Sequence, residues 1–225
     1  MKRTTSLFML TAVILFCILA AGCVRTPEPA PQVPGQDEDT EPEEEPREAP
    51  DEETPGIRPA DFFPLELGLS WEYQGEGNEY ASFTREVVFT DGNLGQIRED
   101  NGGTVTASVF KTDSEAVTLV YFLGEAYGDD NYLNSVPNSN VAILKAPLEV
   151  GTKWEEPNGT REIIDTNAAV STPAGNFDQC IKVEIDNPNS TVYEYYKKDI
   201  GLVKREFISG DTRVTSSLEN FSGQQ

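Results

Sequence analysis

Residues 58–225 predict an all-β domain, mostly antiparallel, whose strands form a sandwich, a strongly curved sheet or an open barrel. Runs of aromatic and β-branched residues, which favour strands, recur throughout this part of the chain. Turns rich in glycine, asparagine and proline separate these runs about every 8 to 15 residues. No segment keeps a helical period of apolar residues for more than about two turns.

The first 22 residues have the layout of a secretory signal peptide. Lys2 and Arg3 precede an apolar run over residues 7–21. That run is too short for a comfortable membrane span and begins too close to the N-terminus. A cleaved signal peptide over residues 1–22 is therefore expected.

The signal peptide ends in the letters LAAGC at residues 19–23. This ending resembles the lipobox of bacterial lipoproteins, although that family usually has leucine where this chain has Ala20. The resemblance implies cleavage between Gly22 and Cys23 and a diacylglyceryl group on the Cys23 thiol. Two acyl chains such as palmitate suffice for stable anchoring, which places the protein on the extracytoplasmic side of the cell membrane. The alternatives are a plain secreted protein with a chance cysteine and an uncleaved anchor helix.

Residues 23–57 are expected to form a disordered linker. Eight of the 34 residues at 24–57 are proline, and twelve acidic residues face only Arg25 and Arg47. Such a segment buries too little apolar surface to offset the entropy of ordering it. We interpret it as an acidic stalk that holds the folded part away from the membrane. The alternative is an acidic recognition tail for cations or a basic partner.

The predicted β domain is itself acidic. Residues 58–225 hold 27 acidic and 13 basic residues, a net charge of −14. A surface of this sign argues against nucleic acid and anionic lipid headgroups as direct partners. The remaining partner, a protein or a small apolar ligand, is not identified by the sequence.

The expected strands follow one another with short turns between them. Residues 116–123 (AVTLVYFL) form a continuous apolar run and are expected to be the most buried strand. Residues 172–176 are expected to turn a hairpin, because they contain proline and glycine. After Trp71 and Tyr73, the expected strands are residues 83–90, 96–99, 104–111, 116–123, 141–144, 161–171, 177–186, 192–196, 202–208 and 212–218.

One phrase occurs twice. PLELGLSWEY at residues 64–73 returns as PLEVGTKWEE at 147–156, and TREVV at 84–88 returns as TREII at 160–164. Glycine permits a turn that a Cβ would obstruct, and a tryptophan at a strand start buries a large apolar area. The repeat predicts two related halves, each with Trp71 or Trp154 as its first inward residue. The alternative is a ligand platform made of two exposed indoles.

Three phrases together resemble a family of uncharacterised bacterial lipoproteins of Firmicute type. They are FPLELGLSWEY at residues 63–73, TPAGNF at 172–177 followed by Cys180, and YY at 195–196 followed by GLVK at 201–204. The resemblance implies an extracytoplasmic β domain related to curved-sheet envelope lipoproteins, which include open-barrel lipoprotein carriers. It implies no activity.

The residue inventory excludes several chemistries. The chain has no histidine and three cysteines, which excludes Ser/His/Asp and Cys/His catalysis and both histidine and thiolate zinc sites. Cys17 is removed with the expected signal peptide and Cys23 is the expected lipid acceptor, so Cys180 has no disulfide partner. A lone cysteine in a strand is usually a buried apolar residue. Asp129 and Asp130 lie in an acidic loop that lacks the EF-hand spacing of a calcium site. No cofactor or metal is expected, and bound calcium in this loop is the alternative.

These observations favour a tethered, non-enzymatic binding or envelope-assembly module. The first alternative is a carrier whose curved sheet encloses a lipid or another apolar ligand against Tyr121, Phe122 and Tyr195. A large cavity lined by these residues is the feature that distinguishes the carrier from the module. The second alternative is a hydrolase that uses two carboxylates.

Overall fold

The computed structural model describes residues 56–223. The predicted signal peptide, the anchor at Cys23 and nearly all of the predicted linker lie outside these residues. In the part that is described, no helix is long and apolar enough to cross a membrane.

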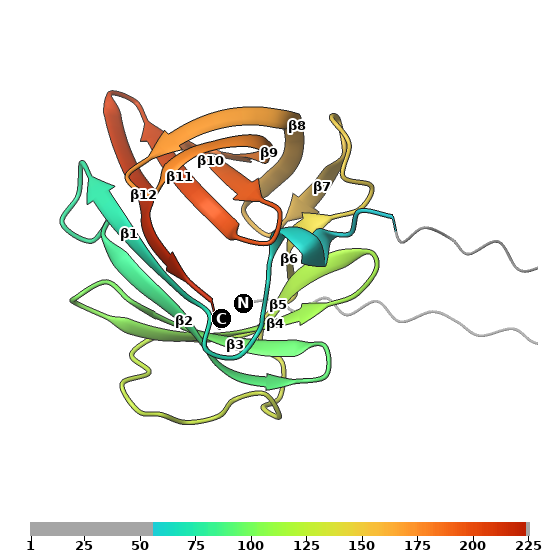
Figure 1. The fold of residues 1–225 in the computed structure, drawn as a ribbon, viewed down its shortest axis with the longest axis vertical. Helices are drawn as coiled ribbons and strands as arrows, with labels where there is room; N and C mark the ends of the chain where they lie inside the picture. Colours follow the sequence, from blue (N-terminus) through green and yellow to red (C-terminus); the bar gives the residue numbers. More distant parts are fainter. Residues whose placement is uncertain (1–55, 224–225) are drawn as a thin grey trace, which may run out of the picture. The chain divides into compact units, whose positions relative to one another are not determined.

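The described chain is an all-β domain, as predicted (Figure 1). Every neighbouring pair of strands is antiparallel. A short 3-10 segment, η1 (Pro59–Phe62), precedes the strands. The strands are β1 (Ser70–Glu76), β2 (Phe83–Asp91), β3 (Leu94–Asp100), β4 (Val105–Thr112), β5 (Ala116–Leu123), β6 (Val141–Lys145), β7 (Lys153–Glu156), β8 (Gly159–Thr172), β9 (Gly175–Asn187), β10 (Ser190–Lys197), β11 (Gly201–Ser209) and β12 (Thr212–Ser222).

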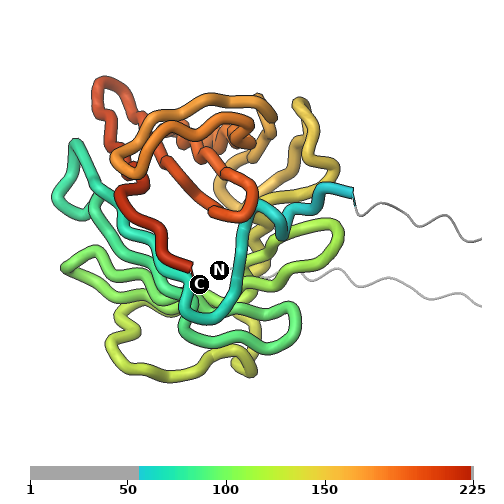
Figure 2. Tube along the Cα trace, in the orientation of Figure 1, coloured from blue at the N-terminus to red at the C-terminus, as the bar shows by residue number. Residues whose placement is uncertain are grey.

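All twelve strands belong to one sheet that curls into a nearly closed barrel (Figure 2). Its order is β6-β5-β4-β3-β2-β1-β12-β11-β10-β9-β8-β7. The sheet therefore consists of two six-stranded meanders, β1–β6 and β7–β12, joined where β1 pairs with β12. The two free edges, β6 and β7, meet at a seam. There the Trp154 indole donates to the Ala142 carbonyl (2.9 Å) and Arg161 Nη1 donates to the Ile143 carbonyl (3.3 Å).

The two meanders begin in the same way, which confirms the two related halves. Trp71 of β1 lies opposite Arg85 of β2, and Trp154 of β7 lies opposite Arg161 of β8. Residues opposite one another on neighbouring strands point to the same face of a sheet. The repeated phrases thus place one tryptophan and one arginine side by side in each half.

The glycine of each phrase has the backbone conformation that the sequence predicts. Gly68 has a φ of 83° and Gly151 a φ of 93°, a region that side chains with a Cβ rarely adopt. The amide of Gly68 donates to the Val87 carbonyl (2.9 Å), and the amide of Gly151 donates to the Ile163 carbonyl (2.8 Å). The same turn therefore leads the chain into the first strand of each half.

The N-terminal segment plugs one end of the barrel. The ring of Phe63 packs against those of Phe110 (4.8 Å between centroids) and Tyr196 (6.4 Å). The Asp61 carbonyl accepts a hydrogen bond from the amide of Asp199 in the β10–β11 turn (2.7 Å). We call this the plugged end.

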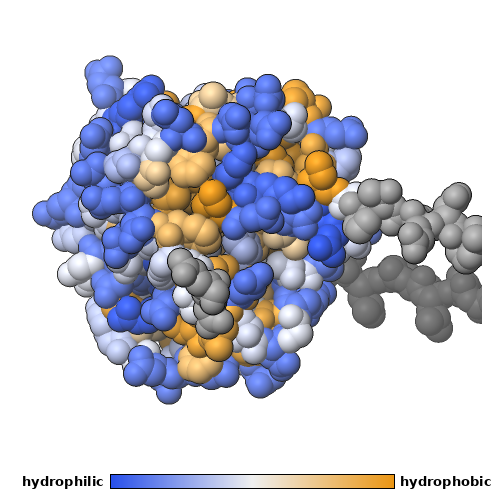
Figure 3. Space-filling model, in the orientation of Figure 1, coloured by the Kyte–Doolittle hydropathy of each residue, from blue (hydrophilic) through white to orange (hydrophobic). Residues whose placement is uncertain are grey.

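On the face drawn in Figure 3, hydrophilic residues surround separate patches of apolar ones.

The other end of the barrel carries the β1–β2, β3–β4 and β11–β12 turns, and we call it the open end. Because neighbouring strands run in opposite directions, these turns lie at the end of the strands away from η1.

The long β8–β9 hairpin bends and reaches β12. Register shifts at Asp165 and Ala168 mark bulges that bend its strands. At its tip, the Ala174 amide donates to the Leu218 carbonyl (2.9 Å). Gly175 in the predicted 172–176 turn has a φ of 135°, which confirms the hairpin and explains its glycine.

The prediction that residues 116–123 form the most buried strand is wrong. Only Val117 of β5 is buried. Because β5 lies next to the edge strand β6, its C-terminal half has neighbours on fewer sides. Its outer face is partly covered by the β5–β6 loop, where Tyr121 stacks on Tyr132 (5.4 Å).

Candidate functional site

A network of charged side chains lies inside the barrel. Glu194 is at its centre and is only 3% exposed. Its carboxylate accepts hydrogen bonds from Tyr196 Oη (2.6 Å), Arg161 Nη1 (2.8 Å) and Arg205 Nε (2.9 Å). We call six charged residues of this interior the internal charge network: Arg85, Glu99, Glu156, Arg161, Glu194 and Arg205.

The surroundings of Glu194 keep it ionised. Burial would raise the pKa of its carboxyl, but Arg161, Arg205 and Tyr196 outweigh that effect and lower the pKa to about 2. The same contact acts in reverse on the phenol, because burial and the neighbouring carboxylate both raise the pKa of Tyr196. Glu194 is therefore an anion throughout the physiological range.

A second ion pair lies in the first half of the barrel. Arg85 Nε contacts Glu99 Oε2 at 2.6 Å, and its guanidinium lies over the rings of Phe83 (5.2 Å) and Tyr73 (5.9 Å). Burial opposes ionisation of Glu99, but Arg85 lowers the pKa of this carboxyl below its usual value. The Glu99 carboxylate and the two aromatic rings therefore fix the position of the Arg85 guanidinium, and Glu99 stays ionised.

Glu156 has the opposite environment. Its Oε1 lies 2.7 Å from Arg161 Nε, but neither atom makes a well-aligned hydrogen bond. Burial raises the pKa of Glu156, and the nearby Arg161 only partly offsets this. Two carboxyl groups that share one arginine, Glu156 and Glu194, therefore have pKa values shifted in opposite directions.

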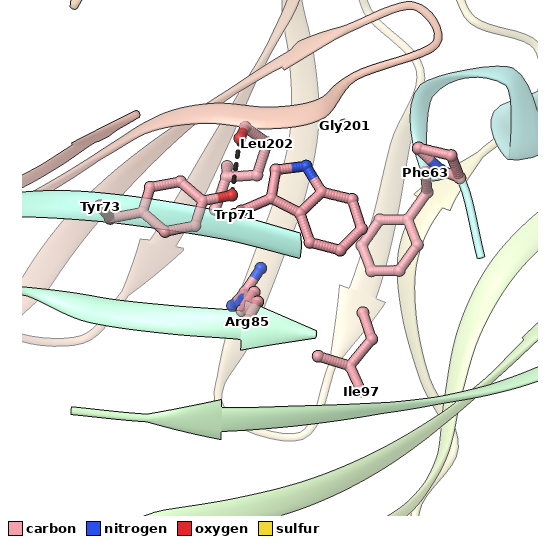
Figure 4. Close-up of a pocket in the computed structure, with 8 residues that line it drawn as sticks. Phe63, Trp71, Tyr73, Arg85, Ile97, Gly201 and Leu202 are labelled. Carbon is pink, nitrogen blue, oxygen red and sulfur yellow. Dashed lines mark hydrogen bonds between the residues drawn. The ribbon is translucent and has the colours of Figure 1, made fainter. Parts of the chain in front are cut away.

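The interior between the plugged end and this network is filled. The space between Phe63, Trp71, Tyr73 and Arg85 has a volume of only about 10 Å³ (Figure 4). That is room for about one water molecule. The Tyr73 hydroxyl spans this space and donates to the Leu202 carbonyl (2.7 Å).

The cavity expected for the carrier alternative is not formed by the residues proposed for it. Tyr121 stacks on the β5–β6 loop rather than on the interior. Tyr195 lies opposite Lys182, and the Lys182 ammonium is 5.2 Å from the Tyr195 ring. Successive strand residues point to opposite faces, and Val183 next to Lys182 is buried, so this pair points outward. Phe122 is 47% exposed. For Tyr121, a register shift between β4 and β5 contributes, because it places Tyr121 opposite Val109 and Leu119 opposite Phe110. Tyr195 lies between the buried residues Glu194 and Tyr196, so the regular alternation of β10 turns it outward.

At the open end, a concave pocket of about 330 Å³ lies above the charge network. Phe83, Phe207 and Val214 supply apolar walls, and Glu99 and Arg205 supply charge. The Ser216 hydroxyl donates to the Ala81 carbonyl (2.7 Å) and so is already occupied. We call this pocket the mouth; it is lined by Asn78, Tyr80, Ala81, Phe83, Glu99, Arg205, Phe207, Val214 and Ser216.

Both repeated tryptophans are core residues, as predicted. Trp71 is 4% exposed and Trp154 is 7% exposed. The Trp71 indole donates to the Ile200 carbonyl (2.7 Å), and that of Trp154 donates to the Ala142 carbonyl (2.9 Å). The alternative of an exposed indole platform is therefore wrong, because both rings fill the interior and both N–H groups are used within the protein.

Cys180 is fully buried in the core, as its sequence context predicts. Burial raises the pKa of its thiol to about 11, so the reactive thiolate is scarce at neutral pH.

In a chain carrying Cys17→Ser and Cys23→Ser, the folded protein should therefore react with Ellman's reagent on the order of 100-fold more slowly than a free thiol. One thiol per chain should become reactive in denaturant. Rapid labelling of the folded protein at neutral pH would contradict the buried thiol.

Asp129 and Asp130 lie in the β5–β6 loop. Buried Gln96 holds this loop, because its side chain donates to the Asp130 carbonyl (2.9 Å) and accepts from the Tyr132 amide (2.7 Å). Within residues 56–223, no group of three or more histidine, cysteine or acidic residues is placed to hold a metal ion. The loop is thus fastened to the sheet by an amide side chain.

Sequence reasoning missed the charged residues of the interior. The repeat of Thr-Arg-Glu at residues 84–86 and 160–162 held the one usable signal. Its two arginines occupy equivalent positions opposite the two buried tryptophans. A charged residue repeated at an inward position indicates a buried ion pair. Glu99, Glu194 and Arg205 lie outside the repeated phrases and carry no such signal.

Two solved structures resemble this chain in fold, at low sequence identity. No family model and no curated protein matches the chain. A protein from Bacteroides fragilis NCTC 9343, described as exported and as having a YmcC-like fold, is 17% identical with a TM-score of 0.43 over 72% of this chain and 99% of its own. A protein from Parabacteroides distasonis ATCC 8503, described as a lipoprotein, is 16% identical with a TM-score of 0.42 over 72% of this chain and 98% of its own. At these TM-scores neither similarity supports a conclusion about this chain.

Proposed function

We propose that the protein is a lipid-anchored extracytoplasmic lipoprotein whose barrel serves as a non-enzymatic binding module. The observation that carries the tether is the LAAGC sequence at residues 19–23, at the end of a signal-like apolar run. The resemblance to uncharacterised lipoproteins of Firmicute type belongs with this proposal. The acidic residues at 24–57 then link the anchor to the β domain in the sequence.

The filled interior favours a module over a lipid carrier. A carrier needs an enclosed apolar volume of roughly 300 Å³ or more. The space beside Trp71 and Tyr73 has only about 10 Å³. The mouth has about 330 Å³, but it is partly charged and lies at the open end rather than in an enclosed apolar interior.

The charge network supports binding rather than hydrolysis. Opposed pKa shifts in two carboxyl groups are typical of acid–base pairs, and Glu156 and Glu194 show such shifts. Both carboxyl groups, however, are paired with Arg161 inside the barrel, and neither lines the mouth. A substrate in the mouth does not meet them.

The anchor is tested by Cys23→Ser. Since the thiol of Cys23 is the acceptor of the lipid, we expect the variant to lose lipid labelling by a radioactive fatty acid and to leave the membrane fraction. Cys17→Ser is the matched control, because Cys17 lies within the signal peptide and should leave anchoring unchanged. Full membrane retention and labelling of the Cys23→Ser protein would contradict the proposal.

A further inference from the structure

We propose that the mouth binds a small zwitterion with an apolar body, of the chemical class of the apolar amino acids. This inference deepens the proposed binding function by naming a site and a ligand class. It does not depend on the lipid anchor, because binding and membrane attachment are measured separately.

Arg205 supplies a site for an anionic group. Its Nε is engaged by Glu194 (2.9 Å). Among residues 56–223, no hydrogen bond occupies its terminal nitrogens Nη1 and Nη2, and its side chain is 33% exposed. A guanidinium held at one nitrogen presents the other two as a planar pair of donors, which matches a carboxylate. The bond to Glu194 fixes the direction in which this pair points.

Glu99 supplies a site for a cationic group in the same pocket. Its Oε2 contacts Arg85 (2.6 Å), whereas its Oε1 has no hydrogen bond among the described residues, and the side chain is 28% exposed. The lowered pKa of Glu99 means that the carboxylate stays charged. A free oxygen of this kind accepts from an ammonium group.

The walls of the mouth supply the apolar contact. Phe83 is buried, and its ring stacks on that of Tyr73 at 4.4 Å between centroids. Tyr80 and Phe207 are 54% and 36% exposed, although large aromatic side chains usually bury most of their surface. The pocket volume of about 330 Å³ lies at the lower end of the range for small-molecule sites, and barrel mouths are a common place for them.

The balance of charge favours a zwitterion over a simple anion. Arg205 and Glu99 present one charge of each sign to the mouth. Residues 58–225 carry a net charge of −14, which repels free anions at long range. A ligand that carries only a cation leaves the donors of Arg205 unused, and one that carries only an anion leaves Glu99 unpaired.

The test is titration of L-phenylalanine into the ¹⁵N-labelled protein, isolated as the cell processes it. If the protein carries acyl chains, nanodiscs of anionic phosphatidylglycerol keep zwitterionic lipid headgroups out of the sample. We expect saturable chemical-shift changes at the mouth, at Tyr80, Phe83 and Phe207. 3-Phenylpropionate and 2-phenylethylamine, which lack the ammonium and the carboxylate respectively, should each bind at least about ten-fold more weakly.

Two variants separate the site from general effects. Arg205→Gln should weaken binding of L-phenylalanine at least about ten-fold. Arg213→Gln is the matched control, because Arg213 is 63% exposed and outside the mouth, and it should leave binding unchanged. Since Arg205 also contacts Glu194, Phe207→Ala provides a variant that leaves the network intact, and it should weaken binding as well.

Three results would overturn the inference. They are the absence of saturable shifts at the mouth up to about 20 mM L-phenylalanine, a range that covers the weak affinities typical of such small ligands; equal binding of the three probes; and unchanged binding by both Arg205→Gln and Phe207→Ala. None of them bears on membrane attachment, which the Cys23→Ser experiment decides.

Discussion

Glu194→Gln is expected to lower the free energy of unfolding by about 3–5 kcal/mol at pH 7. The substitution keeps the shape of the side chain but removes the negative charge that faces Arg161 and Arg205. Removing one partner of a buried ion pair leaves the other charge buried without compensation, which is the costly case. Urea unfolding followed by tryptophan fluorescence measures the change.

The pH dependence gives this prediction a distinctive form. The folded-state pKa of Glu194 is lowered from 4.5 to about 2, so its ionised form is favoured by folding. Its contribution to stability is therefore complete above pH 4.5 and is lost as the pH falls toward 2. The difference in stability between the parent protein and Glu194→Gln should be constant above about pH 5 and should shrink through this window.

Glu156→Gln is the matched control for Glu194→Gln. Both carboxylates contact Arg161, but the pKa of Glu156 is raised, mainly by burial. A raised pKa means that folding disfavours the ionised carboxylate, so a neutral side chain at this position should cost much less. Equal losses from the two variants, or a stability difference for Glu194→Gln that persists to pH 2, would show that the network does not work as described.

The strand positions and the repeat could be predicted because they depend on local signals. Gly68 and Gly151 need a backbone angle that other residues disfavour. Trp71 and Trp154 follow these turns at the same spacing, so the first two strands of each half align in the same register. Duplication of a local signal is sufficient to predict duplication of the structure.

The mouth and the charge network could not be predicted, because they depend on which strands meet. Glu99, Glu194 and Arg205 come from β3, β10 and β11, and alternation makes a charged strand residue look solvent-facing. The bulge at Tyr195/Tyr196 and the one at Val87/Phe89 also shift the inward positions. Tyr195 was expected inside the barrel, but it lies between the inward residues Glu194 and Tyr196 and therefore points outward.

Trp71→Ala and Trp154→Ala are each expected to lower the free energy of unfolding by about 3–5 kcal/mol. Each removes a ring that is nearly fully buried and leaves a carbonyl without its donor, at Ile200 or at Ala142. Because the chain has two tryptophans, each variant retains one indole as the fluorescent reporter of unfolding.

Substitution by phenylalanine separates packing from hydrogen bonding. Trp71→Phe and Trp154→Phe keep most of the apolar volume and lose the indole N–H, so each should cost less than the matching alanine variant, with a hydrogen-bond share of about 1–3 kcal/mol. A melting temperature within one or two degrees of the parent for either alanine variant would contradict the role of that tryptophan in the core.

Substitutions at Trp71 and Trp154 should increase local opening in different parts of the sheet. Trp71 lies in the continuous part of the sheet, where β1 pairs with both β2 and β12. Trp154 lies at the seam, where side-chain hydrogen bonds to Ala142 and Ile143 connect two edges. Amide hydrogen exchange should therefore accelerate selectively in β5 and β6 for Trp154→Phe, because local opening follows the weakest edge. Equal acceleration in β5 and β6 for Trp71→Phe would mean that the seam is not held by the Trp154 indole.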